Sequence, residues 1–308
     1  MHNIISLENS DLKAHILPYG ATLAGLWNVN DPRSLVLGFK ETEDYRQSNF
    51  YCGAIVGPIA NRIANGRVVI DGQSHLLPQN EGRNTLHSGA EGLHQRVWDV
   101  SDVTPSSVAL TCALGDGACG LPGARVITAE YSLDGPMLQL RMTATSDRMT
   151  LMNPAHHPYW AVNDHARLRI NSSKVLDVDA SKLPTGRADD VDGTDFDLNA
   201  FSPVPKTLDH CFVLNPHKRY APEPVAELKM PHYTLRIETD APGLQVYAGA
   251  ALPKLADEKT QGWPIAPYSG LALEPQFWPD APNHDHFPSI LLPPQHQWTQ
   301  ITRYVLEF

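Results

Sequence analysis

The 308-residue chain lacks several features that mark particular classes of protein. It has no apolar run long enough to span a bilayer, and its opening MHNIISLENSDLK has neither the basic start nor the apolar stretch of a secretory signal. Basic residues are few, with 24 Lys and Arg against 34 Asp and Glu, for a net charge of −10. This balance disfavours nucleic acid or an anionic membrane as partner. We therefore expect a cytoplasmic protein with a small neutral ligand.

Cysteine and nucleotide-binding motifs are also scarce. The four cysteines include no CxxC pair, which predicts reduced thiols, although Cys112 and Cys119 flank a glycine-rich loop and could bridge. That loop, GDGACG, lacks the strand, helix and lysine context of a dinucleotide or phosphate site. The sequence therefore gives no reason to expect a bound nucleotide.

Proline and glycine are plentiful and scattered. The 26 prolines and 21 glycines divide the chain into many short segments, which is typical of an all-β protein. No window has the long 3.6-residue periodicity of a substantial helix, so helix is expected only in short turns, such as the region near Glu41 to Tyr45.

Three segments have the pattern of β-hairpins. Asp71-Gly72 and Asp134-Gly135 each separate two strand-like runs, and such pairs readily adopt the positive φ of a tight turn. After the second turn, Leu138, Leu140 and Met142 alternate with polar residues, as in a strand with one face in a core. TLRIETDAPGLQVYAG predicts a third hairpin around residues 240–243.

The chain is predicted to be one domain spanning residues 1–308. It contains no internal repeat and no low-complexity linker, and the acidic stretch at 185–201 is interpreted as a long surface loop. Many strands joined by hairpins predict a large antiparallel β-sandwich with few short helices.

Three widely separated segments offer side chains suited to proton transfer. They are NTLHSG around His87, NPAHHPYW around His156 and His157, and LALEPQFWPDAPN around Glu274. Glu274 follows three apolar residues, which places its carboxylate at the end of an apolar strand. Burial of a carboxylate in such a position either lowers stability or serves a functional role.

These segments resemble the conserved blocks of the aldose 1-epimerase, or galactose mutarotase, family. LVLGF at 35–39, GAIVGPIANRIANGRVVIDG at 53–72 and KTLDHCFVL at 206–214 extend the resemblance over nearly the whole chain. It implies a large β-sandwich and an enzyme that interconverts the α and β anomers of a free aldose. Such a reaction needs one acid and one base, with no cofactor and no metal.

The resemblance also assigns roles to individual residues. Glu274 is placed at the catalytic base and His157 at the acid, with His87 holding the C1 oxygen. Adjacent strand residues face opposite sides, so only one of His156 and His157 can enter the pocket. With ordinary pKa values of about 4.3 and 6.5, the glutamate would be ionised and able to take a proton, and the histidine could donate one.

Sugar hydroxyls are assigned to Arg62, Asn61 and Asp209. A guanidinium offers several donors in fixed geometry, and a carboxylate accepts bonds from neighbouring hydroxyls. Taken alone, Arg62 would be interpreted as a structural ion pair and Asp209 as a turn cap. His94 matches no functional position and is expected at the surface.

Several alternatives remain open from the residues. The histidines at 284 and 286, with those at 156 and 157, are the only plausible metal cluster, but their spacing matches no zinc motif. A hexose-6-phosphate epimerase of the same fold would need a basic pocket, for which the candidates are Arg62, Arg67, Arg83 and Arg96. A glycosidase using Glu274 with Asp209, or a carbohydrate-binding protein without turnover, are further possibilities. The chain is expected to act as a monomer or a homodimer.

Overall fold

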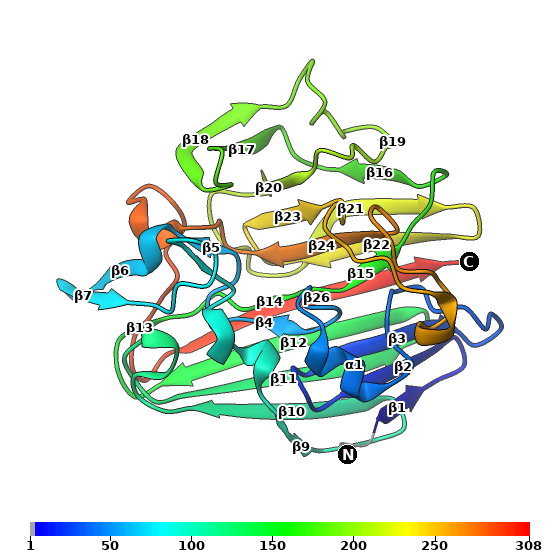
Figure 1. Ribbon diagram of the computed structural model, residues 1–308, viewed down its shortest axis with the longest axis horizontal. Coiled ribbons are helices and arrows are strands. Elements are labelled where there is room, and N and C mark those ends of the chain that lie inside the picture. The colour runs from blue at the N-terminus through cyan, green and yellow to red at the C-terminus, as the bar shows by residue number, and fades with distance from the viewer. Residues whose placement is uncertain (1–3) are drawn as a thin grey trace.

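The computed structural model describes residues 4–308, apart from the side chain of Asp257. The first three residues of the predicted 1–308 domain, where MHNIISLENSDLK begins, lie outside this range. Strands dominate the chain (Figure 1), and the single α-helix of the described residues is α1 (Thr42–Gln47), close to the predicted position. Within residues 4–308, no helix is long and apolar enough to cross a membrane.

Two large sheets make up most of the structure, and their strands pair antiparallel. The nine-stranded sheet has the order β19 (Ser202–Pro203), β16 (Arg167–Ile170), β21 (Glu223–Met230), β22 (Tyr233–Thr239), β26 (Gln297–Glu307), β12 (Met137–Ser146), β11 (Arg125–Asp134), β10 (Ser107–Leu114) and β9 (Asp99–Ser101). The six-stranded sheet has the order β15 (Tyr159–Ala161), β24 (Gly270–Gln276), β23 (Gly243–Tyr247), β20 (Asp209–Val213), β17 (Lys174–Val178) and β18 (Pro184–Asp190). The predicted antiparallel β-sandwich is confirmed.

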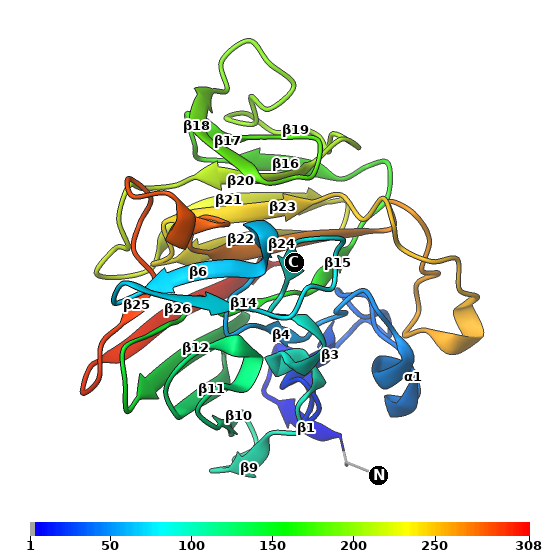
Figure 2. The ribbon, with the colours of Figure 1, turned by 60° about the vertical axis from the view of Figure 1, so that its left-hand side comes forward.

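Smaller elements surround these sheets (Figure 2). The short strands form five groups: β1 (Ile5–Glu8), β2 (Leu12–Leu17) and β3 (Thr22–Asn28); β4 (Ile55–Val56) and β14 (Ala155–His156); β5 (Arg62–Ile63) and β8 (Thr85–Leu86); β6 (Arg67–Ile70) and β7 (Gln73–Leu76); β13 (Thr150–Leu151) and β25 (Leu291–Leu292). The 3₁₀ turns are η1 (Ala64–Gly66), η2 (Gly89–Glu91), η3 (Leu93–Gln95), η4 (Ala118–Gly120), η5 (Asp257–Lys259) and η6 (Ala281–Asn283).

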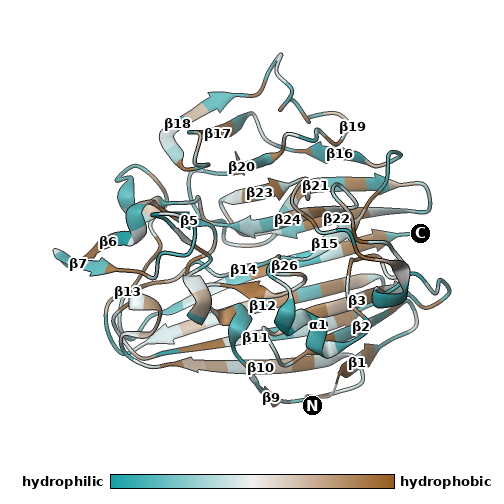
Figure 3. Ribbon diagram, in the orientation of Figure 1, coloured by the Kyte–Doolittle hydropathy of each residue, from teal (hydrophilic) through white to brown (hydrophobic). Residues whose placement is uncertain are grey.

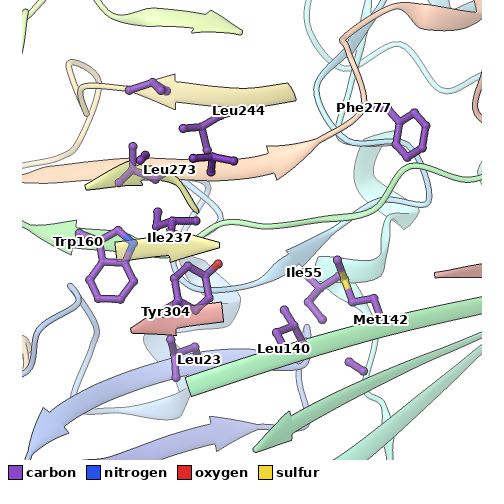
Figure 4. Packing of buried hydrophobic residues seen from close by; sticks show 14 of the residues in the cluster. Leu23, Ile55, Leu140, Met142, Trp160, Ile237, Leu244, Leu273, Phe277 and Tyr304 are labelled. Carbon is purple, nitrogen blue, oxygen red and sulfur yellow. The ribbon is translucent and has the colours of Figure 1, made fainter. Parts of the chain in front are cut away.

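The main buried core combines residues of the two large sheets with residues of β1, β2 and β3. Along β12, Leu138, Leu140 and Met142 are buried while the residues between them are partly exposed, so the predicted alternation is confirmed. Figure 3 shows this alternation on the long strands, whereas α1 is largely hydrophilic. Ile237 of the nine-stranded sheet and Leu273 of the six-stranded sheet belong to the same buried cluster (Figure 4), which joins the two layers.

Substitution of Leu140 by alanine is expected to lower the free energy of unfolding by about 2–5 kcal/mol, because it leaves a cavity in a close-packed core. Val69→Ala is the matched control, since the Val69 side chain lies on the β6–β7 hairpin and is 54% exposed. Urea denaturation followed by tryptophan fluorescence measures both variants. Equal losses of stability would contradict the placement of the core.

Two of the three predicted hairpins are confirmed, and the third is wrong. Asp71 and Gly72 have φ of +49° and +73° between β6 and β7, and β11 pairs with β12 across the second turn. β22 and β23 do not pair, because β22 belongs to the nine-stranded sheet and β23 to the six-stranded sheet. Asp240 Oδ1 accepts a hydrogen bond from the Ile301 N–H at 3.0 Å, which holds the end of β22 on its own sheet. The segment 240–242 therefore crosses between layers.

The acidic stretch at 185–201 is only partly a loop. Its first part belongs to β18, an edge strand that pairs with β17. Thr185 Oγ1 and Arg187 Nη2 donate to Asp177 Oδ2 at 2.7 and 2.9 Å, and Lys174 Nζ lies 2.8 Å from Asp190. These cross-strand pairs stabilise a charged strand at the sheet edge, where charge also discourages pairing with other chains.

The four cysteines are buried and free. Cys112 and Cys119, the pair that could have bridged, are therefore separate thiols, and burial raises the pKa of Cys112 to about 11. A thiol of such high pKa has little thiolate character and is unreactive.

Candidate active site

A cavity of about 390 Å³ opens on the face of the six-stranded sheet that is turned away from the core. Its lining residues are Asn49, Phe50, Tyr51, Asn61, Arg62, Glu81, Leu86, His87, His157, Tyr159, Asp209, Gln245, Tyr247, Ala251, Leu252 and Glu274. All six residues predicted for the site line this cavity. The chain thus brings together side chains that lie more than 200 positions apart in the sequence.

The pairing register of β24, β23 and β20 brings the acidic residues Glu274 and Asp209 to the same side of the sheet. Glu274 of β24 lies opposite Gln245 of β23, and Tyr247 of β23 lies opposite Asp209 of β20. Because side chains alternate between the faces of a sheet, these four residues point to one side while Leu273 points into the core. The apolar run before Glu274 therefore fixes the orientation of its carboxyl group.

His87 and Asn61 come from a separate part of the chain, next to the β5–β8 strand pair. β5 and β8 pair, and Asn61 directly precedes β5 while His87 directly follows β8. His87 Nδ1 accepts the Asn61 N–H at 3.1 Å, and the His87 N–H donates to the Asn61 carbonyl at 3.0 Å. Both residues have positive φ, +50° and +61°, a conformation that costs free energy and is typical of functional sites.

Two buried polar side chains, those of Asp280 and Asn153, connect the separate segments of the chain that form the site. Asp280 Oδ1 accepts the Ala64 N–H at 3.0 Å, and the Asp280 N–H donates to the Arg62 carbonyl, also at 3.0 Å. Asn153 Oδ1 accepts the Phe277 N–H at 2.9 Å. The segment after Glu274 therefore positions both the β5–β8 strand pair, which contains Arg62, and the segment that contains His156 and His157.

The adjacent histidines face opposite sides of the backbone. His157 lines the cavity and is held by its N–H, which donates to the Ala54 carbonyl at 2.9 Å. His156 points toward the core, where its Nδ1 lies 3.0 Å from the hydroxyl of Tyr304 and its ring contacts that of Tyr131. Only His157 can therefore reach a ligand in the cavity.

His157 and Glu274 form a buried pair at the base of the cavity. The distance from His157 Nε2 to Glu274 Oε1 is 3.6 Å, and both residues are at most 4% exposed. Burial, assisted by the charge of Asp209 and opposed by Arg62, raises the pKa of Glu274 well above its ordinary value. Burial lowers the pKa of His157 to about 4.

The expectation of ordinary pKa values for this pair is therefore wrong. Both shifts favour the uncharged forms, a protonated carboxyl group at Glu274 and a neutral imidazole at His157. The physical reason is burial, which a sequence pattern cannot measure. The ion pair with the proton on His157 has the same number of protons and is separated from this form by one transfer over a short distance.

His87 is a neutral hydrogen-bond donor. Because its Nδ1 accepts the Asn61 N–H, we assign the proton to Nε2. Burial and the neighbouring His157, His94 and Arg62 lower the pKa of His87 well below its ordinary value. The imidazole therefore stays uncharged and can donate from Nε2 to an oxygen.

The same assignment argues against a metal at this site. His87, His157 and Glu274 place ligand atoms within 4.8 Å of one another. With Nδ1 occupied and Nε2 protonated, His87 has no free lone pair, and two remaining ligands are fewer than zinc sites provide. His284, from the other candidate cluster, stacks on Phe287 outside the cavity lining.

The residues expected to bind hydroxyls form one connected network. Arg62 donates to Glu81 from Nε and Nη2 at 2.7 and 2.9 Å, and its Nη1 lies 3.8 Å from Asp209 Oδ2. Gln245 Nε2 donates to Asp209 Oδ1 at 2.9 Å. Glu81 and Gln245 were missed from the sequence. Gln245 is detectable as a polar residue in the apolar strand GLQVY, whereas Glu81 has no signal that separates it from a surface acid.

Aromatic rings support the histidines from behind. Tyr51 lies 4.5 Å from His87, 4.9 Å from His94 and 5.8 Å from His157, measured between ring centroids. The prediction that His94 lies at the surface is wrong, because the 3₁₀ turn η3 directs it inward and leaves it 7% exposed. Burial lowers its pKa to about 4.

Comparisons with known proteins agree with this architecture. Residues 3–305 match the family model for aldose 1-epimerase. Galactose mutarotase from Sus scrofa is 32% identical over 97% of this chain and 92% of its own length, and aldose 1-epimerase from Escherichia coli (strain K12) is 30% identical over 96% and 92%. The crystal structure of a GalM/aldose epimerase homologue from C. elegans superimposes with a TM-score of 0.91 at 29% identity, covering 100% of this chain and 99% of that one. Galactose 1-epimerase from Lactobacillus acidophilus NCFM gives 0.86 at 28%, covering 98% and 93%.

Proposed function

This chain belongs to the aldose 1-epimerase family, and we propose that it interconverts the α and β anomers of a free aldose in the cavity around Glu274. It is therefore an enzyme, an isomerase that acts on a carbohydrate. The observation that carries the proposal is the buried pair of Glu274 and His157, whose side chains lie 3.6 Å apart in the cavity.

The reaction requires two coupled proton transfers. The C1 hydroxyl loses a proton while the ring oxygen gains one, so the bond between C1 and the ring oxygen breaks and C1 becomes an aldehyde. Rotation about the C1–C2 bond presents the other carbonyl face. Reversal of both transfers then closes the ring as the opposite anomer. One acid and one base are sufficient, because ring closure returns a proton to the acid and removes one from the base, so both end the cycle in their starting protonation states.

Glu274 is the base and His157 the acid in this proposal. The two oxygens that exchange protons are both bonded to C1, so two groups 3.6 Å apart can each reach one of them. Hydroxyls that donate to the Glu274 carboxylate stabilise its charged form, as the charge of Arg62 already does. A bound polyol thus favours the ionised form of Glu274, which can act as the base.

The remaining residues hold the sugar while C1 rotates. His87 donates from Nε2 to the C1 oxygen, which stabilises negative charge as the hydroxyl loses its proton. Arg62, Asn61 and Asp209 bind the other hydroxyls and keep the ring-opened sugar in place. Neither a cofactor nor a metal takes part in these steps.

The pH dependence of kcat/KM is expected to be a bell with a low acid limb. Activity needs one proton on the pair, so it falls when His157 gains a second proton near its lowered pKa of about 4, and again above the raised pKa of Glu274. A stopped-flow polarimetric profile from pH 3 to 9 measures both limbs, with the non-enzymatic rate subtracted. A maximum confined between pH 4.3 and 6.5, the ordinary values, would contradict the shifts.

We further propose that residues 1–308 act as one domain, as a monomer or a homodimer in the cytoplasm. A single domain is favoured because the cavity takes Arg62 from the first quarter of the chain and Glu274 from the last. The net charge of −10 disfavours binding to an anionic membrane and supports this location.

The proposed function is tested with a panel of free aldoses and their methyl glycosides. We expect faster anomer exchange for at least one free aldose and no reaction of the methyl glycosides, which have no C1 hydroxyl proton to lose. Binding without exchange would indicate a carbohydrate-binding protein. Cleavage of a methyl glycoside would indicate a glycosidase that uses Glu274 with Asp209.

A further inference from the structure

Glu81 belongs to the cavity wall but has no part in the proton transfers. Its carboxylate accepts two hydrogen bonds from Arg62, at 2.7 Å from Nε and 2.9 Å from Nη2. This is the bidentate arrangement in which a guanidinium binds a carboxylate or a phosphate most strongly. The Glu81 side chain is 36% exposed, compared with 13% for Arg62, so Glu81 covers one edge of the guanidinium from the open side.

The pairing occupies the edge of the Arg62 guanidinium formed by Nε and Nη2, and leaves Nη1 and the second N–H of Nη2 for sugar hydroxyls. Its Nε and Nη2 are bonded to Glu81, and its remaining Nη1 lies 3.8 Å from Asp209 Oδ2. The cavity lining contains one cationic side chain, that of Arg62, and three carboxyl groups, from Glu81, Asp209 and Glu274. A phosphate or carboxylate on a sugar would therefore meet like charges at short range.

The other arginines that could have built a basic pocket lie elsewhere. Arg67 donates from Nε to Ser74 on the β6–β7 hairpin, and Arg96 lies 3.8 Å from Glu91. Arg83 is exposed, and none of these three arginines lines the cavity. Of the four arginines proposed for a basic pocket, only Arg62 lines the cavity, and it is paired with Glu81.

We propose that Glu81 is a specificity-determining residue that restricts this site to uncharged aldoses. The inference rests on the proposed function and names the substrate class of the same cavity. Glu81 occupies one of the guanidinium edges that could bind an anion, and it adds a negative charge beside Asp209. An aldose with a phosphate or a carboxylate must displace Glu81 or remain next to both carboxylates.

The test compares neutral and anionic aldoses with the variant Glu81→Gln. Galactose is the neutral probe, and galacturonate and galactose 6-phosphate are the anionic probes. We expect the ratio of kcat/KM for anionic over neutral aldose to rise about tenfold or more in Glu81→Gln, because one like charge is removed at short range, and the gain should shrink at high salt. Glu91→Gln is the matched control, since Glu91 pairs with Arg96 outside the cavity, and its ratio should stay at the wild-type value.

An unchanged ratio in Glu81→Gln would overturn the proposal, whether or not overall activity falls. If this variant turns over too slowly, affinities for galactose and galacturonate from NMR titration replace the rates, and an unchanged affinity ratio has the same meaning. A wild type that already prefers galactose 6-phosphate would also overturn it. Failure of the proposed function is a different result, in which wild-type protein accelerates anomer exchange of no free aldose.

Discussion

Replacement of Glu274 by glutamine is expected to reduce kcat by roughly 10² to 10⁴-fold, with KM changed by much less. An amide of the same shape can still contact hydroxyls but cannot accept a proton from the C1 hydroxyl. The carboxyl group is buried and its pKa is raised, so the protein already tolerates an uncharged group at this position. Polarimetry of freshly dissolved α-anomer measures the rate.

Urea unfolding of the variant distinguishes the loss of a catalytic group from a loss of stability. Glu274→Gln should unfold at the same urea concentration as the wild type or a higher one, because it removes a titratable group from a buried site. A kcat within a few-fold of wild type would contradict the role of Glu274 as base. A clearly lower urea midpoint would mean that the loss of activity comes from reduced stability of the fold.

Replacement of His157 by asparagine is expected to lower kcat by a similar factor, roughly 10² to 10⁴-fold, because the ring oxygen loses its proton donor. The adjacent His156→Asn is the matched control. The His156 ring faces the core and lies 3.0 Å from the Tyr304 hydroxyl, so its loss should reduce stability and leave kcat near wild type. Kinetics and urea unfolding on both variants separate the two effects.

The double variant Glu274→Gln with His157→Asn adds a further check. Groups that act as one unit lose their function when either is removed, so the double variant should be little slower than the slower single variant. Multiplication of the two single losses would indicate independent roles. Equal kinetic losses in His157→Asn and His156→Asn would contradict the opposite orientation of the two rings.

Much of the fold follows from local sequence patterns. Alternation along β12 predicts its buried face, and Asp71-Gly72 predicts a tight hairpin, because both depend on neighbouring residues alone. The strand break after Thr239 depends on a contact with Ile301, more than sixty residues away, so the wrong third hairpin could not be avoided from its own sequence. The edge strand β18 similarly depends on partners such as Asp177 in β17.

For the site, the sequence predicted which residues come together but not their electrostatics. The resemblance of separate segments to one family brought six residues together, and all six line one cavity. Its electrostatics could not be predicted, because the lowered pKa of His157 and the raised pKa of Glu274 arise from burial created by the whole fold. Glu81 was missed because its importance comes from contact with Arg62, from which it is separated in sequence by the β6–β7 hairpin, and a single acidic residue carries no such information.

Magnetisation exchange between the C1 protons of the two anomers tests the central claim most directly, because it observes the reaction at equilibrium in both directions. With galactose, or the best aldose of the panel, we predict an exchange rate that rises in proportion to wild-type enzyme concentration. With the Glu274→Gln and His157→Asn double variant, the sugar should still bind while exchange stays at the uncatalysed rate. Undiminished exchange in the double variant would show that this pair does not open the sugar ring.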